Sequence, residues 1–183
     1  MKNSTVRTRR LDLVPLAVAH ADEMTGVLAD PALHTFIGGA PLTRPELRAR
    51  YERLAAGSPD PAVVWCNWVV RVRAEDRLAG TVQATVTGGG RTAEVAWVIG
   101  TDWQGRGIAR EAAGALVGLL VDRGVRTVVA HVHPDHAASA GVARAAGLAP
   151  TDEEQDGEIR WELRSPTGDG RDGEVRGESR TAP

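Results

Sequence analysis

The feature that most constrains this chain is a glycine-rich turn between a β-type segment and an amphipathic helix. Residues 92–99 are rich in β-forming side chains, and residues 104–109 have the sequence Gln-Gly-Arg-Gly-Ile-Ala. From residue 108 to residue 120, apolar side chains recur at the spacing of one helical face. Such a turn presents free backbone N–H groups at the positive end of a helix dipole. The segment therefore predicts an anion-binding site.

Three phosphate-binding patterns compete for this turn. A nucleoside-triphosphate loop requires a lysine after its last glycine, and none follows Gly107. The dinucleotide fingerprint requires a third glycine where this chain has Arg110. The third pattern is Gln/Arg-x-x-Gly-x-Gly/Ala, which Gln104, Gly107 and Ala109 satisfy. The third pattern is therefore the one that the sequence favours.

The remaining elements indicate an α+β domain. Three β-rich runs at 63–72, 78–87 and 92–99 are separated by short turns, which predicts an antiparallel meander. Thr43 and Glu46 form a capping box for a helix that extends to about residue 56. The other expected elements are a strand at 11–16, a helix at 20–29, a strand at 127–132, a helix at 137–146 and a strand at 158–163.

Length and composition limit the alternatives. A chain of 183 residues fits one domain, expected here over residues 1–164, and residues 165–183 are too polar to offset their ordering entropy, which predicts a disordered tail. The formal net charge of -2 gives no indication of a nucleic-acid partner. No apolar run is long enough for a membrane span, and the single cysteine, Cys66, fits a reducing compartment, so we expect a cytoplasmic protein.

The turn and its flanking elements resemble the Gcn5-related N-acetyltransferase superfamily. The arrangement from Arg9-Arg10-Leu11 to Gly147-Leu148 is similar to the branch that contains the ribosomal-protein N-terminal acetyltransferases. The resemblance covers residues 6–164 and implies a mixed, mostly antiparallel central sheet flanked by about four helices. It also implies transfer of an acetyl group from acetyl-coenzyme A to an amine by direct attack.

The resemblance implies a set of cofactor contacts. In this family the turn holds the coenzyme A pyrophosphate, and the preceding strand pairs its backbone with the pantetheine arm. His136 and Ser139 stand where relatives have an Asn-x-x-Ser motif, with His136 in place of the asparagine. The expected cofactor-binding residues are Trp97, Val98, Ile99, Gln104, Gly105, Arg106, Gly107, Ile108, Ala109, Arg110, His136 and Ser139.

Two residues are candidates for the chemistry. Amine acetylation needs an uncharged nucleophile, and Glu94 is the only ionisable residue on the strand before the turn. Partial burial would raise the pKa of its carboxyl group toward a value useful for a general base. Many relatives protonate the thiolate with a tyrosine, where this chain has Ala143, so Ser139 is the candidate for bonding the thiolate. Tyr51, the only tyrosine, is remote in sequence.

The resemblance places the acceptor groove at His34, Phe36, Ile37, Trp65 and Trp68. The acceptor is either the N-terminal amine of a protein or a small-molecule amine, and a homodimer is left open. A different class of function is a non-catalytic acyl-CoA-binding sensor, because Ala143 and His136 depart from the usual site. His131 and His133 lack the carboxylate spacing of a metal site, so no metal is expected.

Overall fold

The structure, a computed structural model, describes residues 3–165. Eight strands form one sheet in the order β1-β2-β3-β4-β5-β6-β8-β7, and only the β5–β6 pair is parallel. The strands are β1 (Val6–Arg7), β2 (Leu11–Pro15), β3 (Val64–Val72), β4 (Arg77–Thr87), β5 (Thr92–Ile99), β6 (Thr127–Val132), β7 (Ala149–Gln155) and β8 (Glu158–Arg164). The predicted mixed and mostly antiparallel sheet is confirmed.

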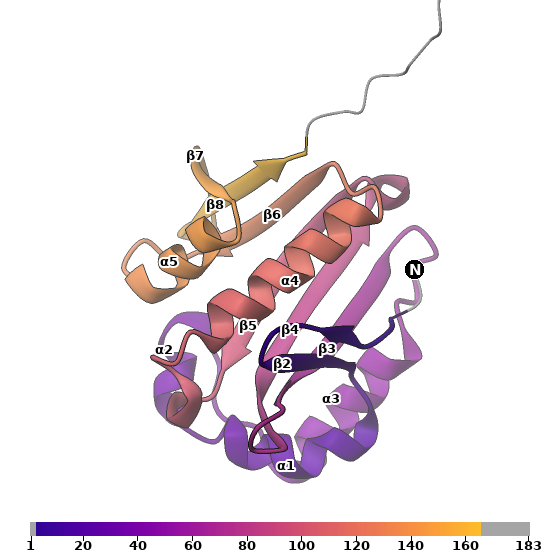
Figure 1. Cartoon of the computed structure of the whole chain (residues 1–183), viewed down its shortest axis with the longest axis vertical. Coiled ribbons are helices and arrows are strands. Elements are labelled where there is room, and N and C mark those ends of the chain that lie inside the picture. The colour runs from indigo at the N-terminus through magenta and orange to yellow at the C-terminus, as the bar shows by residue number, and fades with distance from the viewer. Residues whose placement is uncertain (1–2, 166–183) are drawn as a thin grey trace, which may run out of the picture.

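Helices cover both faces of this sheet (Figure 1). The α-helices are α1 (Ala21–Val27), α2 (His34–Ile37), α3 (Arg44–Ala56), α4 (Ile108–Asp122) and α5 (Ala137–Ala145). None of the helices in the described range is long and apolar enough to cross a membrane.

Most of the expected elements are present. The meander corresponds to β3, β4 and β5, and the predicted capping box between Thr43 and Glu46 begins α3. Three elements were not predicted: β1, α2 and β7. The expected tail falls almost entirely on residues 166–183, which lie outside the described residues.

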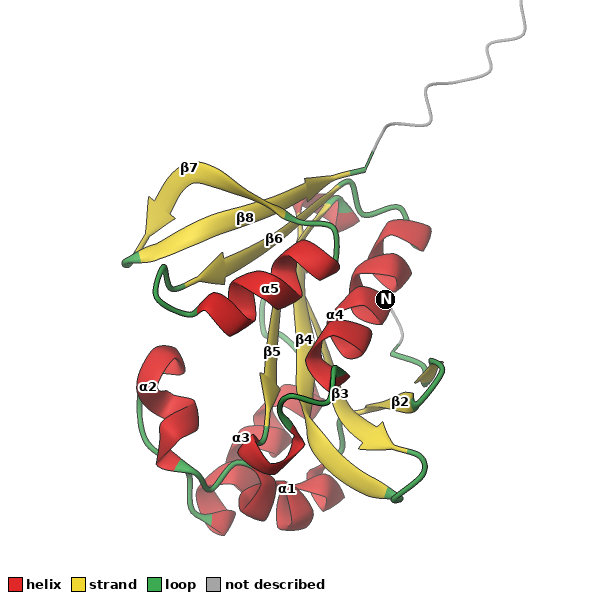
Figure 2. Ribbon diagram, turned by 60° about the vertical axis from the view of Figure 1, so that its left-hand side comes forward, coloured by secondary structure: helices red, strands yellow, loops and turns green. Residues whose placement is uncertain are grey.

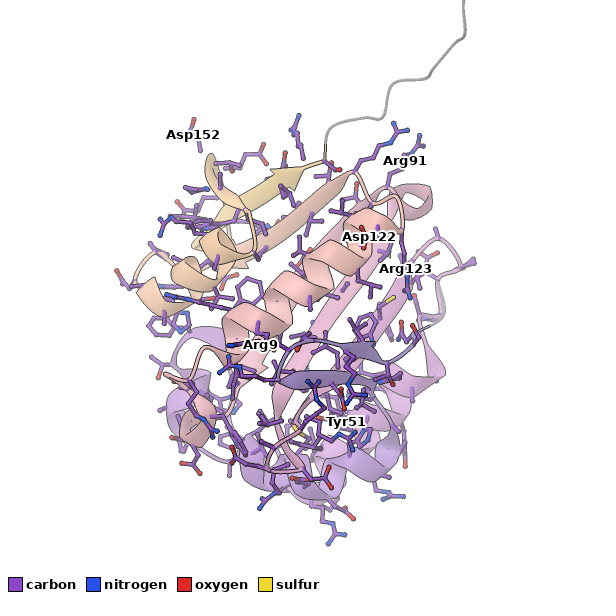
Figure 3. All side chains as sticks on the ribbon, in the orientation of Figure 1. Arg9, Tyr51, Arg91, Asp122, Arg123 and Asp152 are labelled. Carbon is purple, nitrogen blue, oxygen red and sulfur yellow. The ribbon has the colours of Figure 1, made fainter. Side chains whose placement is uncertain are left out.

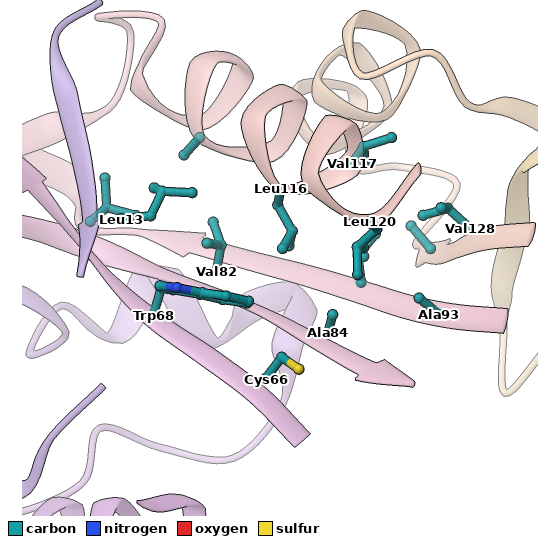
Figure 4. Close-up of a cluster of buried hydrophobic side chains, with 14 of the residues drawn as sticks. Leu13, Cys66, Trp68, Val82, Ala84, Ala93, Leu116, Val117, Leu120 and Val128 are labelled. Atoms are coloured by element: carbon teal, nitrogen blue, oxygen red, sulfur yellow. The ribbon is translucent and has the colours of Figure 1, made fainter. Parts of the chain in front are cut away.

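Two apolar clusters lie on opposite faces of the sheet. The larger one packs beneath α4, where Leu116 and Leu120 meet Leu13, Trp68 and Val82 (Figure 4). The smaller one joins α1 and α3 to the other face, through residues that include Met24, Leu47, Tyr51 and Val69. Alternation along each strand therefore decides which helices a side chain meets.

The sheet divides at the junction between β5 and β6. Their parallel pairing covers only three positions, from Thr92 opposite Thr127 to Glu94 opposite Val129. Beyond Glu94, β5 continues alongside β4, whereas β6 leaves with β8 and β7 (Figure 2). The second half of β5 consequently has a strand neighbour on one side only.

Candidate active site

The turn between β5 and α4 presents a run of free backbone amides. Gly105 and Gly107 have φ of +72° and +75°, in the left-handed region that glycine adopts without a Cβ penalty. Helical bonding begins when Glu111 donates its N–H to the Gly107 carbonyl. Within residues 3–165, the N–H groups of residues 105–110 have no backbone acceptor. This geometry suits an anionic group such as a pyrophosphate.

Hydrogen bonds from the side chains of Gln104 and Arg10 fix the backbone around the turn. Gln104 donates its side-chain amide to the Ile99 carbonyl at 2.9 Å, so this amide braces the turn against β5. Arg10 donates to the Arg106 carbonyl at 2.9 Å and to Glu111 at 2.6 Å. Burial raises the pKa of the Glu111 carboxyl group, but hydrogen bonds from Thr8 and Arg10 outweigh it, and the pKa ends below its usual value.

The two arginines of the turn have different surroundings. Arg106 pairs with Glu75 and lies over the Trp103 ring, with 4.9 Å between its guanidinium carbon and the ring centroid. The hydrogen bond that Arg106 donates to the Glu75 carboxylate raises the pKa of Arg106. Arg110 instead extends toward α5, since a Cβ built on Gly141 would lie 3.6 Å from its Nη2 atom. The Arg106 side chain is thus already paired, and the Arg110 side chain lies between the turn and α5.

The second half of β5 offers an unpaired backbone edge next to the turn. Gly100 donates its N–H to the carbonyl of Ala79, a residue of β4, at 2.9 Å. Because antiparallel bonding alternates along a strand, Val98 also bonds toward β4, whereas Trp97 and Ile99 direct their N–H and C=O groups away from it. Gln104 accounts for one of these groups, the Ile99 carbonyl. The edge and the free amides together form a continuous line of backbone donors and acceptors.

Glu94 lies on the sheet face opposite α4, next to His131. The Glu94 Oε1 atom is 3.6 Å from the His131 Nδ1 atom, and both residues line a hollow of about 260 Å³. The Glu94 side chain is 62 % exposed, so the partial burial considered from the sequence is not found. His131, whose side chain is only 16 % exposed, was not expected in this site. Its position on β6, directly after the last paired residues of the β5–β6 junction, brings it there.

Ser139 and His136 are brought to the same region at the start of α5. The Ser139 hydroxyl oxygen accepts a hydrogen bond from the Trp97 indole at 3.2 Å, which joins α5 to β5. His136 packs against Phe36 of α2, with 4.2 Å between the ring centroids, and His133 lies 5.3 Å from the same ring. Burial, followed by the nearby His133, lowers the pKa of His136. A cofactor candidate and an acceptor candidate are therefore in contact.

The five expected acceptor residues do not form one groove. Trp68 is fully buried beneath α4 and donates its indole N–H to the Ser4 carbonyl, so its assignment to a groove is wrong. Trp65 is half-buried on the opposite face, where it pairs with Thr85. His34 lines an apolar hollow described below. The side chain of Ile37 lies outside the described residues.

Tyr51 is the residue that sequence reasoning set aside and the structure brings to the site. Its side chain, labelled in Figure 3, lines a hollow that also includes Thr81 of β4 and Val98 of β5. Leu47, Tyr51 and Leu54 recur at helical spacing along α3, which is the sequence signal that Tyr51 faces the sheet.

Comparison with known proteins gives the family. Residues 10–149 match the model described as the acetyltransferase (GNAT) domain, so the chain belongs to this family of acetyl-CoA-dependent acetyltransferases. No curated protein sequence matches the chain. Within residues 3–165, no group of three His, Cys, Asp or Glu side chains is arranged to hold a metal ion.

Solved structures share the fold at low sequence identity. One is a RimL ribosomal L7/L12 α-N-protein acetyltransferase in complex with coenzyme A. It has 16 % sequence identity to this chain, the alignment covers 88 % of this chain and 98 % of that chain, and the TM-score is 0.73. An acetyltransferase from Agrobacterium tumefaciens has 23 % identity over 90 % and 96 % of the two chains, TM-score 0.71. A chimera of the Vibrio cholerae spermidine N-acetyltransferase has 18 % identity over 85 % and 95 %, TM-score 0.68.

Proposed function

We propose that this chain moves an acetyl group from acetyl-CoA to a primary amine in a ternary complex. The observation that carries this proposal is the line of free amides at residues 105–110 continued by the unpaired edge of β5. The pyrophosphate would accept hydrogen bonds from the turn, and the pantetheine amides would pair with Trp97 and Ile99. The family membership of the chain and the coenzyme A bound by a structural neighbour support this assignment.

The proposed chemistry uses one base, Glu94, and one hydrogen-bond donor to the leaving group, Ser139. Glu94 removes a proton from the ammonium group through a water molecule, and the neutral amine attacks the thioester carbonyl carbon. After attack the nitrogen gives up a second proton to water, the carbon–sulfur bond breaks as the amide forms, and the thiolate leaves with the electron pair. Because the Ser139 oxygen already accepts the Trp97 indole N–H, its own hydroxyl can donate a hydrogen bond to the thiolate.

The acceptor class is proposed only as a primary amine. Relatives of this fold carry names for two kinds of acceptor, a ribosomal-protein N-terminus and spermidine. The hollow around Glu94 also includes Glu153 and Glu154, opposed by Arg160, so it would attract the ammonium form of either acceptor.

Cofactor binding is tested first, by thermal unfolding. Acetyl-CoA at a hundred times its dissociation constant should stabilise the wild-type protein by about 2.7 kcal/mol, which corresponds to roughly 5–11 °C in Tm. Gly107→Glu should abolish this shift, because it adds a carboxylate where the pyrophosphate would lie. Gly118→Glu adds the same charge at an exposed position of α4 and should keep the shift. No shift in the wild type would refute the proposal.

Catalysis is tested by following thiol release with a panel of peptide and small amines. Glu94→Gln should lower kcat by about a hundredfold or more, as expected for loss of a general base, and should leave the acetyl-CoA-induced Tm shift unchanged. Glu52→Gln makes the same charge change at an exposed position of α3 that lines neither hollow, and should stay within about twofold of wild type. Cofactor binding without thiol release on any amine would instead favour a non-catalytic sensor.

A further inference from the structure

An apolar hollow lies on the α1–α3 side of the sheet, below the end of β5. Its volume is about 100 Å³. Six leucines form most of its wall, and Val98 and Thr81 form its sheet side. The leucines are Leu16, Leu28, Leu33, Leu42, Leu47 and Leu54. The wall comes from α3, from the residues that directly follow β2 and α1, and from α2 with its flanking connections, so the hollow is a product of the tertiary structure and not of one helix face.

One polar group in this wall has no partner. The Tyr51 side chain is 2 % exposed, and its hydroxyl oxygen is fully buried without a hydrogen-bond partner among the described residues. Burial raises the pKa of this hydroxyl to about 12, so it is a neutral donor and acceptor at physiological pH. A buried hydroxyl without a partner is costly, and native proteins seldom keep one without a reason. A bound molecule would supply the missing partner.

The hollow lies on the same face of the sheet as the proposed reaction centre. Val98, Ala96 and Glu94 project from the same face of β5, because side chains alternate along a strand. Four residues of strand span about 13 Å, so the level of Ala96 lies roughly 7 Å from both Val98 and Glu94. An amine nitrogen placed near Ala96 would therefore have Glu94 on one side and the hollow on the other.

The wall also indicates what the hollow excludes. The titratable groups that line it are His34, Arg50 and Tyr51, and it contains no carboxylate. A second ammonium group would be repelled there by the Arg50 guanidinium and would lose its hydration shell. A volume of about 100 Å³ is smaller than a 150 Å³ cavity that holds benzene. The occupant is thus compact, of about four heavy atoms; it carries no positive charge, and the six leucines favour an apolar group.

We propose that the acceptor is a primary amine with a compact, neutral apolar group that fills this hollow and a hydrogen-bonding atom that pairs with Tyr51. This inference rests on the proposed acetyl transfer and narrows its acceptor. Both an N-terminal amine beside a branched side chain and a free amine of the same shape have this chemistry. The acidic hollow around Glu94 receives the rest of the acceptor.

The test compares acceptors by kcat/KM with acetyl-CoA saturating. Leucinamide has the apolar group and a polar atom, isoamylamine has only the apolar group, and spermidine has a second charge. We expect the order leucinamide, isoamylamine, spermidine, with leucinamide at least tenfold better than spermidine. A Leu-initiated peptide that exceeds leucinamide assigns the acceptor to protein N-termini, and the reverse order assigns it to free amines. A preference for spermidine would overturn the inference.

Two variants connect this order to the hollow. Tyr51→Phe should lower kcat/KM for leucinamide about fivefold through KM, leave isoamylamine unchanged, and keep or raise the Tm of the unliganded protein. A fall in kcat on every acceptor would contradict the proposed binding role. Leu28→Trp should fill the hollow and lower kcat/KM for both apolar amines while spermidine is unaffected.

The outcomes separate the two proposals. If no amine releases thiol, or acetyl-CoA gives no Tm shift, the proposed function fails. If amines turn over and the Tm shift is present, but neither variant changes the order of acceptors, only the assignment of the hollow is refuted. The acetyl-CoA shift measured on each variant shows that it is folded.

Discussion

Gly80 on β4 should tolerate no side chain, because it faces the backbone of β5 at close range. A Cβ built on Gly80 would lie 2.1 Å from the Val98 carbonyl oxygen and 2.8 Å from the Ile99 Cδ1 atom. An ordinary contact needs more than 3 Å, so in Gly80→Ala the end of β5 must move away by roughly 1 Å. This is the part of β5 that is proposed to pair with pantetheine.

The cost follows from the structure. Overpacking of a rigid site costs about 1–3 kcal/mol, and loss of one hydrogen bond between β4 and β5 adds roughly 0.5–1.5 kcal/mol. A destabilisation of about 2–4 kcal/mol corresponds to a Tm lower by roughly 4–16 °C for a domain of this size. The neighbouring hydrogen bond from Gly100 to the Ala79 carbonyl, 2.9 Å long, is the one most exposed to the displacement.

Thermal and urea unfolding of Gly80→Ala against the wild type measure this effect. The matched control is Gly118→Ala, at an exposed position of α4 where a Cβ meets nothing within 4 Å. Alanine is the better helix former, so the control should be more stable by about 0.5–1 kcal/mol. If Gly80→Ala melts within about a degree or two of the wild type, β4 and β5 can move apart at little energetic cost, and the reasoning is refuted.

Three further predictions concern single side chains. Glu111→Gln should destabilise the protein by about 1–3 kcal/mol in a urea titration. The reason is that the carboxylate accepts hydrogen bonds from the Thr8 hydroxyl and from the Arg10 backbone and side chain. An unchanged unfolding midpoint would contradict a stabilising role for these bonds. Because the pKa of His136 is lowered in the folded protein, the unfolded chain binds the proton at a higher pH than the folded one. The free energy of unfolding therefore falls as the pH drops below about 6.5. His136→Asn should reduce the difference in unfolding free energy between pH 7.5 and pH 5.5. Cys66 is fully buried, and burial raises its pKa, so a thiol reagent should label it only in denaturant; rapid labelling of the native protein would contradict this.

Elements with a complete local signal were predictable from the sequence. The box of Thr43 and Glu46 begins α3 through contacts three residues apart, and the meander follows from β-branched runs with short turns. In contrast, β7 is polar and contains Pro150, and its place is set by its pairing with β8 along the edge of the sheet. The four-residue α2 is too short for any helical period to appear in the sequence.

The candidate site shows the same division. The shape of the turn was predictable because Gly105 and Gly107 indicate the left-handed backbone that the structure has at both positions. The groove was not, and one part of the error was avoidable: Trp65 and Trp68 are three residues apart on a strand, so they point to opposite faces and cannot line one groove. The contact of Phe36 with His136 joins segments 100 residues apart, and no local pattern predicts it.

The polar side chains of Gln104 and Arg106 make contacts within the protein. The Gln104 amide bonds to Ile99, and the Arg106 guanidinium is paired with Glu75. Neither side chain needs to reach a phosphate, because the amides of residues 105–110 and the helix dipole already favour an anion. Fixing the turn by side chains and binding an anion by backbone amides are thus separable functions. The same separation explains how the family pattern can accept either glutamine or arginine at position 104: the position requires a donor for the carbonyl of β5, and both residue types supply one.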